Sequence, residues 1–213
     1  MDDKLYAQLF VLEPTKSQKR RIQIVETAIE CFSKYGFENT TYEKIAAACK
    51  VTRPLIIHYF PEKDSLLQMT ITYIRANLQN FAVAALMKET TTEGQLRAYV
   101  ESTFDWVKDF PAHAQTWLLF YYNASIRPDM KELNSKLVNT GHERIFALLQ
   151  KAHAERKTPR APTMEQAKMI QNLITGSLHS ILTEKSLLSQ TAIRRATIET
   201  VAELAGLKPA KSK

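Results

Sequence analysis

Apolar side chains recur at helical spacing along most of the chain. Near the start, Ile22, Val25, Ile29 and Phe32 follow the i, i+3, i+7, i+10 rhythm of an amphipathic helix, and Gly36 follows them as a C-cap. The sequence contains no strand-like alternation and no internal repeat. The pattern therefore predicts an all-α fold of about nine helices.

Residues 41–60 predict two short helices joined by a three-residue turn. Either Thr40 or Thr41 can cap the first helix, and Thr40 with Glu43 has the spacing of a capping box. The small residues of this helix leave room for a second helix to cross close by. We expect the first helix to end near Cys49.

The second short helix is expected to begin near Arg53. Thr52 is its candidate N-cap, and Pro54 falls in the first turn, where a missing N–H has no intrahelical partner to lose. The apolar side that docks this helix consists of Val51, Leu55, Ile56 and Ile57. The polar side chains left to face outward are Arg53, His58 and Tyr59.

Two short helices in this arrangement are typical of a helix-turn-helix, which makes DNA the first partner to consider. The N-terminal residues of the second helix would face the bases in the major groove, and flanking groups would hold phosphates. Lys63 and the N–H groups at Thr41 are placed for that second role, because helix N-termini attract anions.

The rest of the chain predicts longer helices. Three of them are expected from Pro61 toward Met87, from Thr91 or Thr92 to Pro111, and from Pro111 onward. Three more are expected from Pro128 to about Arg156, from about Met164 to Leu187 and from about Thr191 to Ala205. Two prolines in residues 157–163 predict a loop.

A helix-turn-helix reads few base pairs, so specificity usually requires a dimer that places two such helices in successive major grooves. The last two helices are the best candidates for its interface, because the first of them carries more apolar residues than one intramolecular face needs. Gly176 and Ser180, four residues apart, would let a partner helix approach closely. The alternative is that both helices only fill the core of the monomer.

Composition agrees with a nucleic-acid partner. The 213 residues are 45% hydrophobic, enough for a core, and 29 Lys and Arg against 22 Asp and Glu give a net charge of +7. Such a charge favours a polyanionic partner. It also leaves open an alternative function, a basic helical protein that coats nucleic acid without sequence preference.

Other functional classes find little support. The five histidines show no metal-binding pair, and the sequence has no phosphate loop, dinucleotide fingerprint or G-x-S-x-G motif, so we expect no enzyme, no cofactor and no metal site. Cys31 and Cys49 are expected to be buried thiols. No signal peptide or membrane span is visible, which predicts a cytoplasmic protein without a membrane partner.

Arg21 to Leu67 resembles the DNA-binding domain of TetR/AcrR-type transcriptional regulators. The family's pattern stands here as Phe32, Gly36 and Phe37, Thr40 and Thr41, Ile45 and Ala46, Val51 and Thr52, Phe60, and Lys63 with Leu66 and Leu67. Two positions depart from it. Lys50 stands where the family usually has Gly, with modest strain if its φ is positive, and Ile57 replaces a Tyr whose hydroxyl can reach phosphate.

The resemblance implies an N-terminal arm at 1–17, a three-helix DNA-binding domain at 18–78 and a ligand-binding and dimerisation domain at 79–213. It implies DNA contacts from Thr40, Thr41, Lys50, Thr52, Arg53, Pro54, Leu55, His58, Tyr59 and Lys63. It implies a homodimer through the last two helices, with Ile174, Gly176, Leu178, Ser180 and Ile181 at the interface.

In this family a small molecule enters the helical body and changes the separation of the two DNA-binding domains. The resemblance thus implies a repressor of a pseudo-palindromic double-stranded operator, released by an unknown small-molecule effector. Side chains that would line its cavity are Trp106, Trp117, Phe120, Tyr121, Asn123, His142 and Phe146, each of which is also a candidate for plain core. Residues 117–130 resemble the body of choline-responsive repressors, a short match that does not identify the effector.

Overall fold

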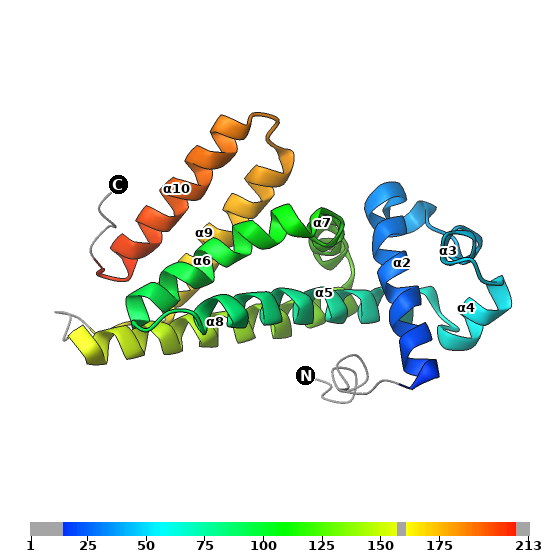
Figure 1. The fold of residues 1–213 in the computed structure, drawn as a ribbon, viewed down its shortest axis with the longest axis horizontal. Helices are drawn as coiled ribbons and strands as arrows, with labels where there is room; N and C mark the ends of the chain where they lie inside the picture. Colours follow the sequence, from blue (N-terminus) through cyan, green and yellow to red (C-terminus); the bar gives the residue numbers. More distant parts are fainter. Residues whose placement is uncertain (1–14, 157–160, 208–213) are drawn as a thin grey trace. The chain divides into compact units, whose positions relative to one another are not determined.

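A computed structural model describes residues 15–156 and 161–207, which form helices and no strand (Figure 1). The helices are α2 (Lys16–Asn39), α3 (Tyr42–Cys49), α4 (Arg53–Tyr59), α5 (Lys63–Leu86), α6 (Thr92–Asp109), α7 (Pro111–Ile126), α8 (Pro128–Arg156), α9 (Met164–Thr183) and α10 (Leu187–Leu204). The predicted all-α fold is confirmed. Residues 1–14 of the predicted arm at 1–17 and residues 157–160 of the predicted loop at 157–163 lie outside the described residues.

The chain forms two compact units. The first comprises Met1–Gln79 and Phe110–Met130, and the second comprises Asn80–Asp109 and Lys131–Lys213. The expected boundary between the DNA-binding domain and the rest of the chain lies between residues 78 and 79. By its packing, however, α7 belongs to the first unit, although it follows that boundary in the sequence. Hydrophobic periodicity cannot show this, because it reports which side of a helix is buried and not against which helix.

In the first unit, α2 is the scaffold. Its N-terminus has a capping box in which the Thr15 hydroxyl accepts from the Gln18 N–H and the Gln18 side chain accepts from the Thr15 N–H. Gly36 leaves helical geometry with a φ of 76°, a conformation that glycine adopts without steric cost, so the predicted interruption at this glycine is confirmed. The helix packs against α7, where the Thr116 hydroxyl donates to the Ile29 carbonyl at 3.2 Å.

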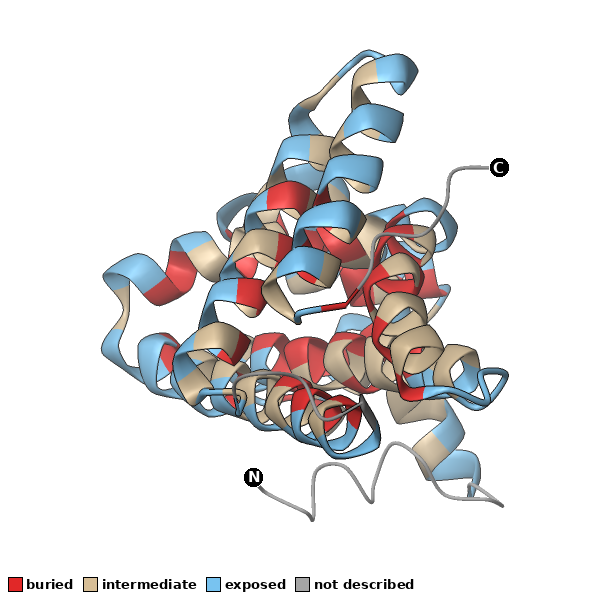
Figure 2. Cartoon of the chain, turned by 90° about the vertical axis from the view of Figure 1, so that its left-hand side faces the viewer, coloured by how far each residue is buried: buried red, intermediate tan, exposed pale blue. Residues whose placement is uncertain are grey.

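The second unit has its own apolar core. Buried side chains from α6, α8, α9 and α10 meet there, among them Val100, Ile145, Ile170 and Val201. Figure 2 shows the pattern that such packing requires, with buried and exposed residues on different sides of the helices. Between α9 and α10, the Thr197 hydroxyl donates to Ser177 Oγ at 2.7 Å.

The predicted junction between the last two helices is wrong. The sequence predicts helix to about Leu187 and a restart near Thr191, whereas α9 ends at Thr183 and α10 begins at Leu187. The reason is a local cap, because Ser186 Oγ accepts from the Ser189 N–H at 3.3 Å. The Gln190 side chain also donates to the Glu184 carbonyl at 2.8 Å.

Candidate nucleic-acid interface

The two helices of the predicted helix-turn-helix have the bounds that the sequence indicates. Thr41 is the N-cap of α3 and accepts from the Lys44 N–H at 3.3 Å. Lys50 ends α3 in the left-handed region, with φ 56° and ψ 45°, and is the one non-glycine residue with positive φ in the described chain. The strain that a non-glycine residue carries there is therefore present at Lys50.

Thr40 is not the N-cap of α3, and its side chain is buried where the sequence predicts a DNA contact. It is fully buried, and its hydroxyl lies 2.7 Å from the Gly36 carbonyl and 3.1 Å from the Cys31 carbonyl. Both carbonyls belong to α2, so the hydroxyl joins residue 40 back to this helix, where it breaks at Gly36. A spacing rule cannot decide between two adjacent threonines, because burial decides it.

The short helix α4 is held by contacts from its neighbours. Only Ile56 among its seven residues is buried. At its C-terminal end, the Tyr42 hydroxyl donates to the Phe60 carbonyl at 2.6 Å, and Arg21 Nη2 donates to the Tyr59 carbonyl at 3.2 Å. The Arg21 guanidinium also lies 5.2 Å from the centroid of the Phe60 ring. A helix this short is marginal alone, so these side chains fix its position.

The remaining predicted DNA contacts form a surface around the N-terminus of α4. Exposed residues of the set are Thr41, Lys50, Thr52, Arg53, Pro54 and His58, and the partly buried ones are Leu55, Tyr59 and Lys63. The Thr52 hydroxyl makes no capping bond, and the ring of His58 meets that of Tyr59 edge-on. We call the six exposed residues the reading surface.

Glu43 lies at this surface, whereas the sequence analysis gave it only the spacing of a capping box with Thr40. Glu43 in α3 places Oε1 2.6 Å from Arg53 Nε in α4. Hydrogen bonds from its own backbone N–H and from the Thr41 hydroxyl, and then the charge of Arg53, lower the pKa of the Glu43 carboxyl. Nothing in the sequence pairs these two residues, which are ten positions apart and on different helices.

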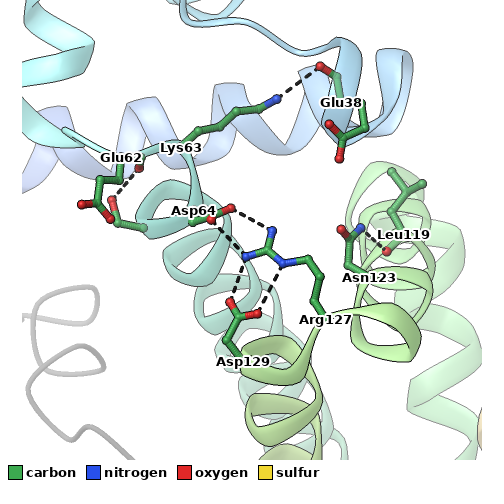
Figure 3. Close-up of polar contacts among 9 residues, drawn as sticks. Glu38, Glu62, Lys63, Asp64, Leu119, Asn123, Arg127 and Asp129 are labelled. Atoms are coloured by element: carbon green, nitrogen blue, oxygen red, sulfur yellow. Dashed lines mark hydrogen bonds and ion pairs between the residues drawn. The ribbon is translucent and has the colours of Figure 1, made fainter.

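Lys63 has a partner within the protein. Its Nζ donates to the Glu38 carbonyl at 3.3 Å and lies 4.4 Å from the centroid of the Phe37 ring (Figure 3). Burial lowers the pKa of the ammonium. Lys63 therefore stabilises the C-terminal end of α2, a role that the sequence analysis did not foresee beside the predicted phosphate contact.

The end of α7 is tied to the start of α5 by a bidentate ion pair. Arg127 Nη1 and Nη2 lie 2.9 and 3.0 Å from the two carboxylate oxygens of Asp64, and Nη2 also reaches Asp129 at 2.9 Å (Figure 3). Both carboxylates raise the pKa of Arg127. Since Asp64 follows Lys63 directly, the same helix start is joined to α2 and to α7.

The seven side chains predicted to line an effector cavity are divided between the units. Trp117, Phe120, Tyr121 and Asn123 belong to the first, and Trp106, His142 and Phe146 to the second. In α7 the rings of Trp117 and Phe120 lie 5.6 Å apart, and those of Trp117 and Tyr121 lie 6.0 Å apart. Asn123 donates to the Leu119 carbonyl at 2.9 Å (Figure 3). Whether the seven line one cavity stays a prediction.

His142 differs from the other six. Its Nε2 is buried without a hydrogen-bond partner in the described structure. Burial, and then the charge of Lys168, lower the pKa of this imidazole. A buried nitrogen of this kind accepts a hydrogen bond from a bound molecule at little cost.

The second unit has a groove that the sequence analysis did not predict. It lies between α6 and α10, encloses about 290 Å³, and has an apolar floor that includes Leu96, Val100 and Ile198. Charged residues of both signs also line it, including Arg97 and Glu101. None of the seven predicted cavity residues lines this groove.

The predicted dimer residues are not equally accessible. Ile174 is buried in the core of the second unit, so it is corrected to a core residue of the monomer. Gly176 and Ser180 are exposed, and a Cβ added at Gly176 would meet no atom within 4 Å. Leu178 and Ile181 are partly buried against the same core.

Two searches of the described residues bear on other functions. Across residues 15–156 and 161–207, no group of three His, Cys, Asp or Glu side chains is placed to hold a metal ion. Within those ranges no helix is long and apolar enough to cross a membrane. Cys31 and Cys49 are buried free thiols, and burial raises the pKa of Cys31.

Comparison with known proteins connects this geometry to a family. Residues 24–69 match the model for bacterial regulatory proteins of the tetR family. The HTH-type transcriptional regulator BetI of Cronobacter sakazakii is 28% identical over 193 residues, which cover 89% of this chain and 93% of BetI.

Two solved structures have the same fold. A putative transcriptional regulator from Saccharomonospora viridis in complex with choline matches with a TM-score of 0.77 and 21% identity, covering 88% of this chain and 97% of that one. AibR, solved with isovaleryl coenzyme A and operator DNA, matches with a TM-score of 0.66 and 16% identity, covering 85% and 97%. With a helix-turn-helix inside the residues that the tetR-family model matches, and with its helical body, this chain is a DNA-binding transcriptional regulator similar to those of the TetR type.

Proposed function

We propose that this regulator is a cytoplasmic repressor that binds a pseudo-palindromic operator as a homodimer and leaves it when a small molecule binds. The observation that supports the proposal is the reading surface, where exposed side chains lie on and beside a short helix that the side chains of Arg21 and Tyr42 hold in place. Occupation of a promoter by such a dimer blocks polymerase without an activation surface.

The roles at the reading surface follow from exposure and chemistry. Arg53, at the first position of α4, is proposed to read a base edge. Thr41, Lys50 and Thr52 are proposed to hold phosphates, together with the N–H groups at the start of α3. Leu55, Tyr59 and Lys63 are proposed to add contacts at its edge, with Lys63 limited by its bond to Glu38.

DNA binding tests this proposal directly. Operator sequences are selected from a random library, and dissociation constants for the selected and a random duplex are compared at physiological salt. Arg53→Ala is expected to cost about 1 to 3 kcal/mol on the selected operator. Lys50→Gln is expected to weaken binding to all DNA sequences alike, and to lower the slope of log affinity against log salt concentration by about one. Equal binding of both duplexes by the unmodified protein would favour the alternative, a non-specific coat.

The homodimer is proposed to form through exposed faces of α9 and α10. Besides Gly176 and Ser180, these helices expose Met169, Leu187 and Leu188, and the last two are 76% and 84% exposed. Apolar side chains so exposed commonly mark an interface. Analytical ultracentrifugation of Gly176→Leu is expected to show a shift toward monomer, and a dimer that persists with unchanged affinity would exclude this face.

Choline is the first effector to test, because a solved regulator of the same fold binds it. The rings of Trp117, Phe120 and Tyr121 cluster in α7, and aromatic faces attract quaternary ammonium groups. Titration with choline is expected to change the Trp117 fluorescence and to release operator DNA. Trp117→Phe separates this signal from that of Trp106, and unchanged DNA binding at saturating choline would exclude choline as the effector.

A further inference from the structure

The ion pair between Glu43 and Arg53 joins the two helices of the reading surface. Glu43 lies in the first turn of α3, and Arg53 is the first residue of α4. Their Oε1 and Nε atoms are 2.6 Å apart, and the side chains remain 62% and 58% exposed. The contact is therefore made on the face that would meet DNA, not beneath it.

The atom that Arg53 uses determines what it has left to offer. Guanidinium carries five N–H donors in a rigid plane, and in the ion pair with Glu43 the atom 2.6 Å from the carboxylate is Nε. The two terminal nitrogens remain for another acceptor. A guanine presents O6 and N7 side by side in the major groove, which suits two parallel N–H donors. The ion pair with Glu43 is thus made at Nε, and the edge that carries the two terminal nitrogens is the one that a guanine requires.

The carboxylate of Glu43 is charged at neutral pH. Hydrogen bonds from its own backbone N–H and from the Thr41 hydroxyl, and then the charge of Arg53, lower its pKa. An ionised carboxylate near the DNA backbone repels phosphates. It therefore opposes a second position for Arg53, in which this long side chain would turn to a phosphate and contribute affinity without sequence preference.

An exposed ion pair alone contributes little to stability. Inside a major groove the same pair is shielded from water, where charged hydrogen bonds are stronger. Its effect is then expected in DNA selectivity and not in the folding of the free protein.

We propose that Glu43 is a specificity-determining positioning residue that orients the Arg53 guanidinium toward a guanine and keeps it from the phosphates. This inference rests on the proposed function, in which Arg53 reads a base. It adds to that function a residue whose negative charge has the same sign as that of the DNA.

The test measures base preference at every operator position. The variants are Glu43→Ala, Glu43→Gln, Arg53→Ala and the double Glu43→Ala, Arg53→Ala, each bound to a randomised operator library and sequenced. Glu132→Ala in α8 is the matched control, because Glu132 makes an exposed ion pair of the same 2.6 Å length with Lys136. Thermal unfolding of each free variant checks that it is folded, and Glu43→Gln keeps the side-chain shape if Glu43→Ala is unstable.

Glu43→Ala is expected to lower discrimination about 5- to 10-fold at the same base pair that Arg53→Ala affects, the lower part of what one bidentate base contact contributes. Binding to random duplex is expected to stay equal or become tighter. The double variant should match Arg53→Ala alone, because without the guanidinium Glu43 has nothing to orient. Glu132→Ala should leave the profile unchanged.

Three results would overturn the inference while leaving the proposed function intact. One is a Glu43→Ala profile identical to that of the unmodified protein, and another is a loss at a base pair that Arg53→Ala does not affect. The third is an equal gain on all sequences, which would make Glu43 only a repulsive charge. If the unmodified protein itself shows no base preference, the proposed function fails first.

Discussion

The helices α4 and α9 achieve stability in different ways. α9 has twenty residues, a capping box made by Thr163 and Gln166, and its own buried stripe that includes Ile170 and Ile174. α4 has seven residues, no side-chain cap at its N-terminus and one buried side chain, Ile56. Side chains from α2 and α3 complete the C-terminal end of α4. The helix proposed to read DNA therefore leaves most of its side chains unburied, because side chains of other helices hold it in place.

The largest effect is expected from the single buried residue of α4. Ile56→Ala is expected to destabilise the first unit by about 2 to 5 kcal/mol, because it leaves a cavity under a helix that has no other buried side chain. Hydrogen exchange should show α3 and α4 losing protection together, with loss of DNA binding.

The matched control is Ile170→Ala, which removes an equally buried isoleucine from the second unit. This substitution is expected to lower protection from hydrogen exchange in α9 and to leave the protection of α4 unchanged. If Ile170→Ala unprotects α4 as strongly as Ile56→Ala does, the contrast between the two helices is wrong.

A smaller effect is expected from the polar support of α4. Tyr42→Phe removes the hydroxyl that donates to the Phe60 carbonyl and is expected to cost about 0.5 to 1.5 kcal/mol. The measurement is local hydrogen exchange at the C-terminal end of α4, together with urea unfolding. Tyr122→Phe, at a 65% exposed tyrosine, should have almost no effect. Equal stability of the two variants would show that packing alone holds α4.

The turn between α3 and α4 carries strain that glycine would relieve. Lys50→Gly is expected to stabilise the protein by about 0.5 kcal/mol, because the left-handed region costs other residues about 1 to 2 kcal/mol and the flexibility of unfolded glycine offsets about 0.5 to 1 of it. Thermal unfolding measures this gain. DNA affinity should fall in the same variant, since a charge on the reading surface is lost. Lower stability would mean that the lysine side chain has a contact worth more than the strain.

The smallest effect concerns pH and separates the two units. Burial lowers the pKa of His113 in the first unit and of His142 and His179 in the second. Unfolded histidine binds protons below about pH 6.5, so folding stability is complete above that pH and declines as the pH falls through it. His113 packs against the rings of Phe110 and Tyr73.

His113→Phe is therefore expected to reduce the loss of stability of the first unit as the pH falls. The loss of stability that His142 and His179 cause in the second unit is expected to remain. The measurement is the melting temperature from pH 7 to pH 5, with hydrogen exchange to assign the change to a unit. A slope that the substitution does not alter would mean that His113 is already protonated to the same extent in both states.

Local rules in the sequence predicted much of the fold and of the reading surface. The interruption at Gly36, the helix starts at Pro111 and Pro128, and the limits of α3 and α4 each depend on a few neighbouring residues. The predicted surface of α4 followed from the same rules, because its exposed residues are those that its apolar side excludes. Such features can be predicted from the sequence because backbone geometry and capping act within about one turn.

Other features required the folded chain. Burial of Thr40 moved the cap to Thr41, packing placed α7 with α2, and the core of the second unit enclosed Ile174. The pairing of Glu43 with Arg53 belongs to the same group.

The sequence by itself determined an all-helical regulator with a helix-turn-helix near its start, because those patterns are local. Only the tertiary structure decided which side chains hold the reading helix and which remain free to meet DNA. The physical reason is that a contact between helices depends on their distance and direction in space, and the spacing of residues along one helix contains neither.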